Sequence, residues 1–238
     1  MKPRLNHSRW AALLFVGWPA LAWAHSPVPG LGRFYSGMLH PVLAPAALIA
    51  LVALGLLIGQ RGLANARLPV LAFLVAVALG GVVGSQFGLP LGPELGPEAG
   101  TQSPGLNVDA LLLGLGLLVA GCVLTAWQPP PAALMALAGS VGALAGLGLS
   151  DMAVSEGRWV VLAGTWLGAA FLALGVAAVA ELARQAWQRI GLRVVASWLA
   201  ASAMLVLGLQ WVGPLPKSGQ AKASSVTAPT PISTPAAN

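Results

Sequence analysis

His40 is the residue whose side chain and position most suggest chemistry. It is one of 3 histidines among 238 residues, and a long apolar segment begins beside it at Pro41. A neutral imidazole binds Ni, Cu and Zn well, and ionisable groups within a bilayer are costly and usually functional. His40 is therefore the first candidate metal ligand. The alternative is that it only lies at the membrane interface, where Pro41 begins a helix.

Two further residues join His40 as candidate ligands. Signal-peptide cleavage before His25 would let its imidazole and the new α-amine bind one ion, whereas the simpler interpretation is that His25 is only what cleavage leaves behind. Asp151 lies in a loop expected on the same side of the membrane and could add carboxylate oxygen. The ion expected at such a site is Ni or another divalent transition metal, and we expect no other cofactor.

The sequence has no arrangement of residues typical of an enzyme. It lacks a Gly-x-Ser-x-Gly elbow with a usable histidine, a His-Glu-x-x-His helix and a phosphate-binding glycine loop. Its single cysteine, Cys122, excludes an intrachain disulfide and any Cys-x-x-Cys site. We therefore predict no catalytic residues and no enzymatic activity.

The composition indicates an all-α integral membrane protein. Hydrophobic residues make up 57% of the chain and charged residues 8%, against roughly 25% charged residues in soluble domains. The net charge of +6 would suggest nucleic acid in a soluble protein. Here the basic residues lie in short loops between apolar segments, which is a signal of membrane topology. The expected partner is the lipid bilayer, and no nucleic acid is expected.

The first 24 residues have the pattern of a secretory signal peptide. A basic start precedes the apolar stretch Trp10–Trp23, and Ala22 and Ala24 are small residues that favour cleavage before His25. The apolar stretch would span only about 21 Å as a helix, short of a hydrocarbon core of about 30 Å. An uncleaved anchor helix is the alternative.

Six apolar segments follow, and each is long enough to cross a membrane as a helix. They lie near residues 39–59, 69–89, 110–127, 133–150, 159–181 and 193–213. The proline run 129–131 separates the third from the fourth, because consecutive prolines cannot continue a helix. These features predict a six-transmembrane-helix bundle after a cleaved signal peptide.

Loop charges predict the orientation. Loops 60–68 and 183–193 carry arginines without acids, whereas loop 90–109 carries acids without bases. Basic loops face the cytoplasm, so the mature N-terminus and the C-terminus should be periplasmic in a bacterial inner membrane. The tail 214–238, rich in Pro, Ser, Thr and Ala, should be disordered.

Glycines at four-residue spacing mark one face of several predicted helices. Small residues at this spacing allow close helix packing in membranes. They are expected to pack a single bundle, and the alternatives are a homo-oligomer interface or a permeation path lined by glycine backbone. The glycines are Gly55, Gly59, Gly80, Gly84, Gly88, Gly142, Gly146, Gly164 and Gly168.

The residues around His40 match the spacing of a known motif. Phe34, Gly37, His40 and Pro41 follow the pattern Gly-Phe-x-x-Gly-x-x-His-Pro-x-x-Gly-x-Asp-His. The segment resembles the first span of the HupE/UreJ family, membrane proteins associated with hydrogenase and urease gene clusters. The resemblance, looser over the rest of 25–213, implies a signal peptide, an exported histidine, a six-span bundle and a role in nickel handling.

The chain departs from this family pattern at its ligand positions. Ala46 and Ala47 stand where the motif has Asp and His, and the segment 146–151 has no histidine where the family has a His-rich motif near the end of its fourth span. The resemblance is thus to a divergent member whose ligand set is degraded.

Three functions remain open on the sequence. The first is an inner-membrane transition-metal permease or metal-supply accessory protein of the nickel type, suggested by the topology and His40. The second is a non-catalytic scaffold or assembly partner in a membrane complex, suggested by spans without charge. The third is a channel for a small neutral solute through a glycine-lined bundle.

Overall fold

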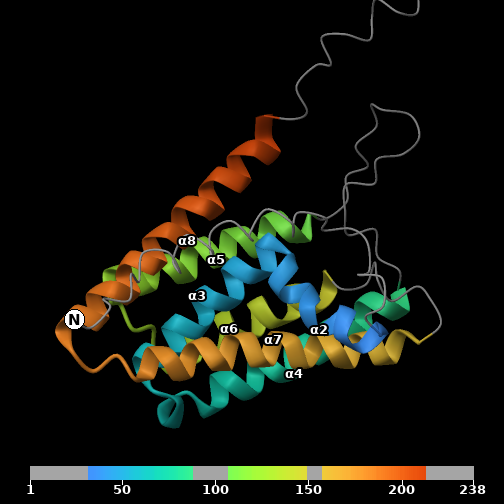
Figure 1. The fold of residues 1–238 in the computed structure, drawn as a ribbon, viewed down its shortest axis with the longest axis horizontal. Coiled ribbons are helices and arrows are strands. Elements are labelled where there is room, and N and C mark those ends of the chain that lie inside the picture. Colours follow the sequence, from blue (N-terminus) through green and yellow to red (C-terminus); the bar gives the residue numbers. More distant parts are fainter. Residues whose placement is uncertain (1–31, 88–106, 149–156, 213–238) are drawn as a thin grey trace, which may run out of the picture.

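The computed structural model describes residues 32–87, 107–148 and 157–212, and this part of the chain is helical with no strand (Figure 1). The prediction of an all-α membrane protein is confirmed. The elements are α2 (Arg33–Leu43), α3 (Pro45–Arg61), the 3₁₀ turn η2 (Leu63–Asn65), α4 (Arg67–Phe87), α5 (Val108–Thr125), α6 (Pro131–Leu147), α7 (Arg158–Glu181) and α8 (Ala186–Val212).

Several predicted features lie outside the described residues. They are the signal peptide 1–24, His25, Gly88, Asp151 and the tail 214–238. Their predictions therefore stay predictions.

Within the described residues, four single helices are long and apolar enough to cross a membrane: α4, α5, α7 and α8. The pair α2 and α3 passes the same test together but is bent by 74°. The remaining apolar helix, α6, is shorter, at 17 residues. A helix or helix pair thus lies over each predicted span, and the count of six crossings stays a prediction.

The first predicted span, 39–59, is a broken helix rather than a continuous one. Ala44 separates α2 from α3 in an extended conformation, with φ −85° and ψ 109°. Pro45 explains the break, because proline has no N–H to donate and disfavours helical geometry in the residue before it. At the break Pro41 and Ala46 are buried, whereas Leu43 and Pro45 are exposed, so one side of the break faces the bundle and the other faces outward.

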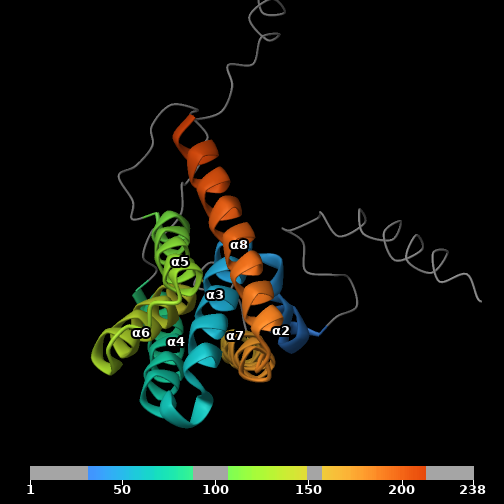
Figure 2. The ribbon, with the colours of Figure 1, turned by 90° about the vertical axis from the view of Figure 1, so that its left-hand side faces the viewer.

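Helix α3 is the centre of the bundle. It packs against α5 on one side and α7 on another, while α2 lies along α7 and α4 along α6. Figure 2 shows α3 surrounded by the other helices. Every residue from Ala53 to Gly59 is buried, so α3 is apolar around its whole circumference, as expected for a helix without an exposed face.

Glycines set the closest helix contacts. A Cβ added to Gly55 would lie 2.6 Å from the carbonyl oxygen of Ala173, and one added to Gly142 would lie 2.6 Å from that of Phe73. Real Cβ atoms essentially never come within 3.0 Å of another heavy atom in this way. The same holds for Gly59 against α7, Gly80 and Gly146 between α4 and α6, and Gly164 and Gly168 against α2. Gly84 is buried.

Helix α8 differs from the other long helices in its exposure. Only 11% of its most apolar stretch is buried, against 33% to 50% for α4, α5 and α7. It packs mainly on α5 and diverges from the bundle toward its C-terminal end (Figures 1 and 2). Large apolar side chains, among them Trp187 and Trp198, cover its outer faces. Much of the apolar surface of α8 is therefore left uncovered by the other described helices.

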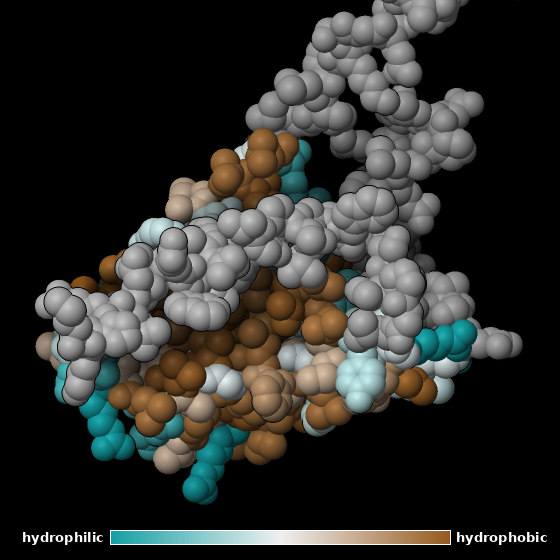
Figure 3. Space-filling view, viewed as in Figure 1, coloured by the Kyte–Doolittle hydropathy of each residue, from teal (hydrophilic) through white to brown (hydrophobic). Residues whose placement is uncertain are grey.

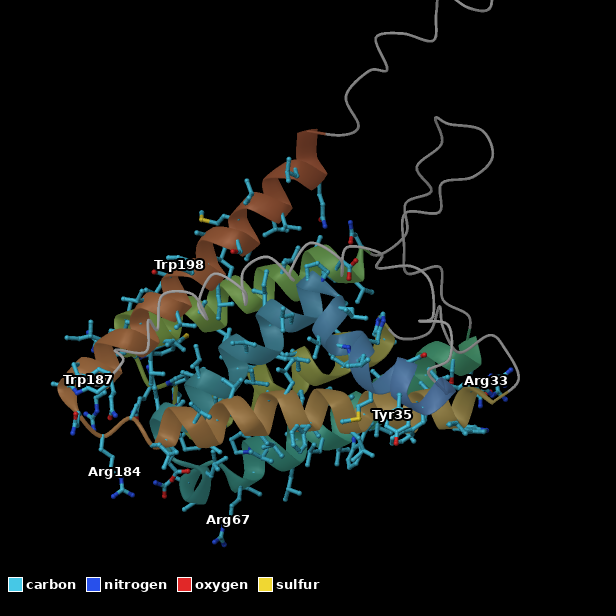
Figure 4. The ribbon with its side chains drawn as sticks, viewed as in Figure 1. Arg33, Tyr35, Arg67, Arg184, Trp187 and Trp198 are labelled. Atoms are coloured by element: carbon cyan, nitrogen blue, oxygen red, sulfur yellow. The ribbon has the colours of Figure 1, made fainter. Side chains whose placement is uncertain are left out.

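Two hydrogen bonds tie the connections together at the opposite end from His40. Arg61 Nη1 donates to the carbonyl oxygen of Pro129 at 2.6 Å, which links the end of α3 to the proline hairpin. The backbone N–H of Leu63 donates to Glu181 Oε2 at 3.4 Å, which links η2 to the end of α7. Figure 4 shows Arg67 and Arg184 pointing outward in this region.

Candidate functional site

The break between α2 and α3 positions His40. His40 lies in the last turn of α2, and its carbonyl oxygen accepts a hydrogen bond from Ala44 N–H at 2.9 Å. Its side chain is half-buried. Because α3 leaves at 74° to α2, His40 lies beside the start of α3 rather than one turn below it on a continuous helix.

The break also leaves backbone polar groups without helical partners. Pro41 and Pro45 have no N–H, so the carbonyls of Gly37 and Pro41 have no donor four residues later. The first N–H groups of α3, at Ala46 and Ala47, have no acceptor within the helix. Non-helical backbone at membrane depth is tolerated only where protein buries it or it lines a cavity. The break is therefore a place where a polar species can be accommodated.

A cavity of about 30 Å³ lies at this break, between five helices. A cavity of this kind needs about 10–15 Å³ to hold a water molecule, so this one has room for a water or a dehydrated ion. Its walls come from α2, α3, α5, α6 and α7. The lining residues are His40, Pro41, Ala44, Ala47, Leu51, Asp109, Leu112, Ala145, Gly148, Thr165 and Ala169.

Three residues with polar side chains line the cavity, each from a different helix, and Asp109 among them is exposed. His40 brings an imidazole from α2, Asp109 a carboxylate from the first turn of α5, and Thr165 a hydroxyl from α7. Thr165 is 1% exposed and donates to the carbonyl oxygen of Val161 at 3.0 Å. Its oxygen keeps lone pairs that can accept or coordinate. The cavity thus offers one nitrogen and several oxygen donors.

The start of α5 holds Asp109 at the cavity. Asn107 caps this helix, with its Oδ1 accepting from Ala110 N–H at 3.0 Å. Asparagine is a preferred N-cap residue because its side chain satisfies one of the free N–H groups of the first turn. The cap fixes where α5 begins, and Asp109 follows two residues later beside the α2–α3 break.

This arrangement was only partly foreseen from the sequence. His40 lines the cavity, whereas the other candidate ligands, His25 and Asp151, lie outside the described residues. Asp109 was placed at the end of a span on the exported side, but it was not counted as a candidate ligand. The Asn107 cap was the available signal, since it starts the third span at the same predicted membrane face as His40. Within the described ranges, no three His, Cys, Asp or Glu side chains group closely enough to hold a metal ion.

The two alanines at the family's ligand positions have different surroundings. Ala47 lines the cavity together with His40. Ala46 is 6% exposed and is not part of the cavity wall. A side chain at position 47 would therefore meet His40 and Asp109, whereas one at position 46 would enter the packed core.

The other motif residues pack α2 against α7. A Cβ on Gly37 would overlap the carbonyl oxygen of Val161, and the backbone of Phe34 lies against Gly164. The ring of Phe34 makes an edge-to-face contact with Tyr35, with 5.5 Å between centroids. Pro41 is buried and lines the cavity. These residues hold the helix that carries His40.

One comparison with known proteins gives a match. The family model described as HupE / UreJ protein matches residues 13–209, which include every helix named above except the last residues of α8. No curated protein and no solved structure matches the chain.

Proposed function

Because the chain belongs to the HupE/UreJ family, we propose that it takes up or supplies a divalent transition metal of the nickel type across a bacterial inner membrane. The single observation that carries this proposal is that His40 and Asp109, from different helices, line one small cavity at the α2–α3 break. The metal is the cargo, and the protein acts on it by binding rather than by catalysis.

The cavity suits an ion that has lost most of its water. Imidazole nitrogen and carboxylate oxygen are both ligands of divalent first-row metals. Thr165 adds a hydroxyl oxygen in a wall that is otherwise apolar. Removing water from an ion is costly, and the Asp109 carboxylate offsets part of that cost by its opposite charge. Only His40 and Asp109 would act as strong ligands, so we expect the metal ion to bind weakly. Weak binding suits a transported ion, because the ion must also be released.

The break between α2 and α3 favours a role in metal transport over a role in metal storage. In many transporters the substrate site lies where spanning helices are interrupted and their ends face the cargo. The α2–α3 break is such an interruption, and the cavity lies against it. Small changes at the break would alter access to His40 while the close contacts of α3 with α7 stay in place.

The distribution of arginines supports an inner-membrane orientation. Arg61, Arg67 and Arg184 lie at the end of the bundle where α3 joins α4 and α7 joins α8. The positive-inside rule favours the cytoplasm for this end. His40 and Asp109 lie toward the other end of the bundle. They would then face the periplasm, from which an imported metal comes.

Uptake measurements test this proposal. Cells that produce the protein should accumulate more Ni or Co than cells with an empty vector, measured by elemental mass spectrometry. His40→Ala should lower the gain about tenfold, equal to about 1.4 kcal/mol of lost binding. Leu39→Ala, a change of the exposed neighbour on α2, is the matched control and should keep uptake. Equal uptake by His40→Ala and the wild type would contradict the proposal.

Asp109→Asn gives a second, independent prediction. The change keeps the size of the side chain and its helix position but removes the charge that offsets the cation. We expect uptake to fall at least tenfold, because hydrogen bonds to charged groups contribute about 1.5–3 kcal/mol and about 1.4 kcal/mol corresponds to a factor of ten. Asn107→Asp, which keeps a capping residue two positions earlier, should leave uptake near the wild-type level. If uptake falls in Asn107→Asp but not in Asp109→Asn, the helix cap and not the Asp109 carboxylate determines uptake.

A role as a membrane assembly partner is the second candidate. The observation that favours it is the exposure of α8, whose outer faces carry large apolar side chains. In this case the protein would pass metal to a partner or hold a complex in the membrane. Uptake into proteoliposomes that contain only this chain separates the two, since a permease works there and a scaffold does not.

A further inference from the structure

A second hollow lies between α4 and α7 and shares no residue with the His40 cavity. It has a volume of about 240 Å³ and runs between Val77 and Val82 of α4 and between Trp159 and Trp166 of α7. All of its lining side chains are apolar or aromatic. Because both helices are predicted spans, this groove faces the hydrocarbon region of the bilayer.

The groove begins at the membrane surface and runs inward. Trp159 to Trp166 covers about 10 Å along the helix axis at 1.5 Å per residue. α7 has 24 residues and is about 36 Å long, so its first turn reaches past a hydrocarbon core of about 30 Å. The groove therefore occupies roughly the outer two-thirds of one leaflet, which is about 15 Å thick.

Among the described residues, those that line the groove offer no free polar side chain, and one wall is held in place by a hydrogen bond. Trp166 Nε1 donates to the carbonyl oxygen of Leu74 at 2.8 Å, so the ring is held against α4 and its only donor is used. Gly81 keeps the floor open, since a Cβ there would lie 3.3 Å from Leu162 Cδ2. A polar solute or peptide backbone would find no partner here.

A guanidinium lies at the outer end of the groove. Arg158 Cζ is 5.4 Å from the centre of the Trp159 ring, within the range of a cation–π contact. A guanidinium that lies on an aromatic ring still has N–H groups available as donors. These groups can bind a phosphate with two hydrogen bonds. Tryptophan also favours the headgroup level of the membrane. The outer end thus matches a phosphate and the inner part a hydrocarbon chain.

We propose that this groove binds one anionic phospholipid, with its phosphate on Arg158 and an acyl chain between α4 and α7. The dimensions favour a lipid over a second protein chain. A volume of about 240 Å³ over about 10 Å gives a mean cross-section of roughly 24 Å², whereas a helix about 10 Å across needs roughly 80 Å². A single hydrocarbon chain matches this cross-section, whereas most of a helix would lie outside the walls of the groove.

Native mass spectrometry of the full-length protein tests the lipid site. The protein is released from nanodiscs that contain phosphatidylglycerol and phosphatidylcholine with the same acyl chains. We expect one phosphatidylglycerol to stay bound, with a preference of about tenfold over phosphatidylcholine. Arg158→Gln should abolish that preference, and Ala163→Phe, which adds a ring to the groove wall, should lower retention of both lipids at least fivefold.

Two matched variants separate the site from general effects. Arg67→Gln removes an arginine from the opposite end of α4, and Leu79→Phe adds a ring at an exposed α4 position outside the groove. Both should retain phosphatidylglycerol as the wild type does. Equal binding of the two lipids by the wild type, or unchanged retention in Ala163→Phe, would overturn the proposal. So would a wild-type dimer that Ala163→Phe converts to a monomer, because a second copy would then be the occupant.

Discussion

Gly168→Val should disrupt the packing of α2 against α7 and destabilise the protein. A Cβ at this position would overlap the backbone carbonyl of Met38, which cannot rotate away as a side chain could. The two helices would have to separate. They would then lose the close packing on which helix association in membranes depends. Overpacking typically costs about 1–3 kcal/mol, and the lost contacts along α2 add to it. We expect a loss of about 3 kcal/mol or more, measured by SDS titration in mixed micelles.

Gly175→Val is the control for this prediction. Gly175 lies seven residues later on the same helix, is exposed, and has nothing within 4 Å of an added Cβ. The substitution changes helix propensity by the same amount but touches no other helix. It should therefore stay within about 0.5 kcal/mol of the wild type. Equal destabilisation of both variants would mean that propensity, and not the α2–α7 contact, determines the effect at Gly168.

The helical membrane fold could be predicted from the sequence because hydropathy reports it directly. Long apolar stretches separated by arginine loops and a proline run indicate spans and their ends. The small-residue spacing also points to real contacts, since Gly55 and Gly59 face α7 in the structure. The spacing could not say which helix each glycine meets. That depends on the whole set of crossings, which no local pattern contains.

The break in the first span was visible in the sequence but was not used. Pro41 and Pro45 are four residues apart, so they remove two successive donors from one side of the helix. Proline in membrane helices often causes only a kink, because neighbouring helices satisfy the freed groups. The 74° bend therefore results from packing against α7 and α5 as well as from Pro45. The same bend brings Asp109 to His40, which is why sequence spacing missed it.

Ala47→His should convert the cavity from a weak site to a strong one. The new imidazole would stand in the cavity wall with His40 and Asp109 and would complete three strong ligands from three helices. Structural zinc sites reach about 10–16 kcal/mol with four ligands, so one ligand contributes about 3 kcal/mol. We expect affinity for Ni or Zn to rise about 100-fold, equal to about 2.8 kcal/mol. Isothermal titration of the purified protein in detergent measures it.

Matched variants test whether the imidazole at position 47, and not only the added side-chain volume, raises the affinity for metal. Ala47→Gln brings a side chain of comparable length without an imidazole, and it should carry the same packing cost of about 1–3 kcal/mol without the gain in affinity. Ala46→Asp, at the buried position outside the cavity, should lower stability and leave metal affinity unchanged. Adding His40→Ala to Ala47→His should remove most of the gain, because the two imidazoles act on one ion. If the gain survives without His40, the added histidine binds metal elsewhere, and the cavity is not the site.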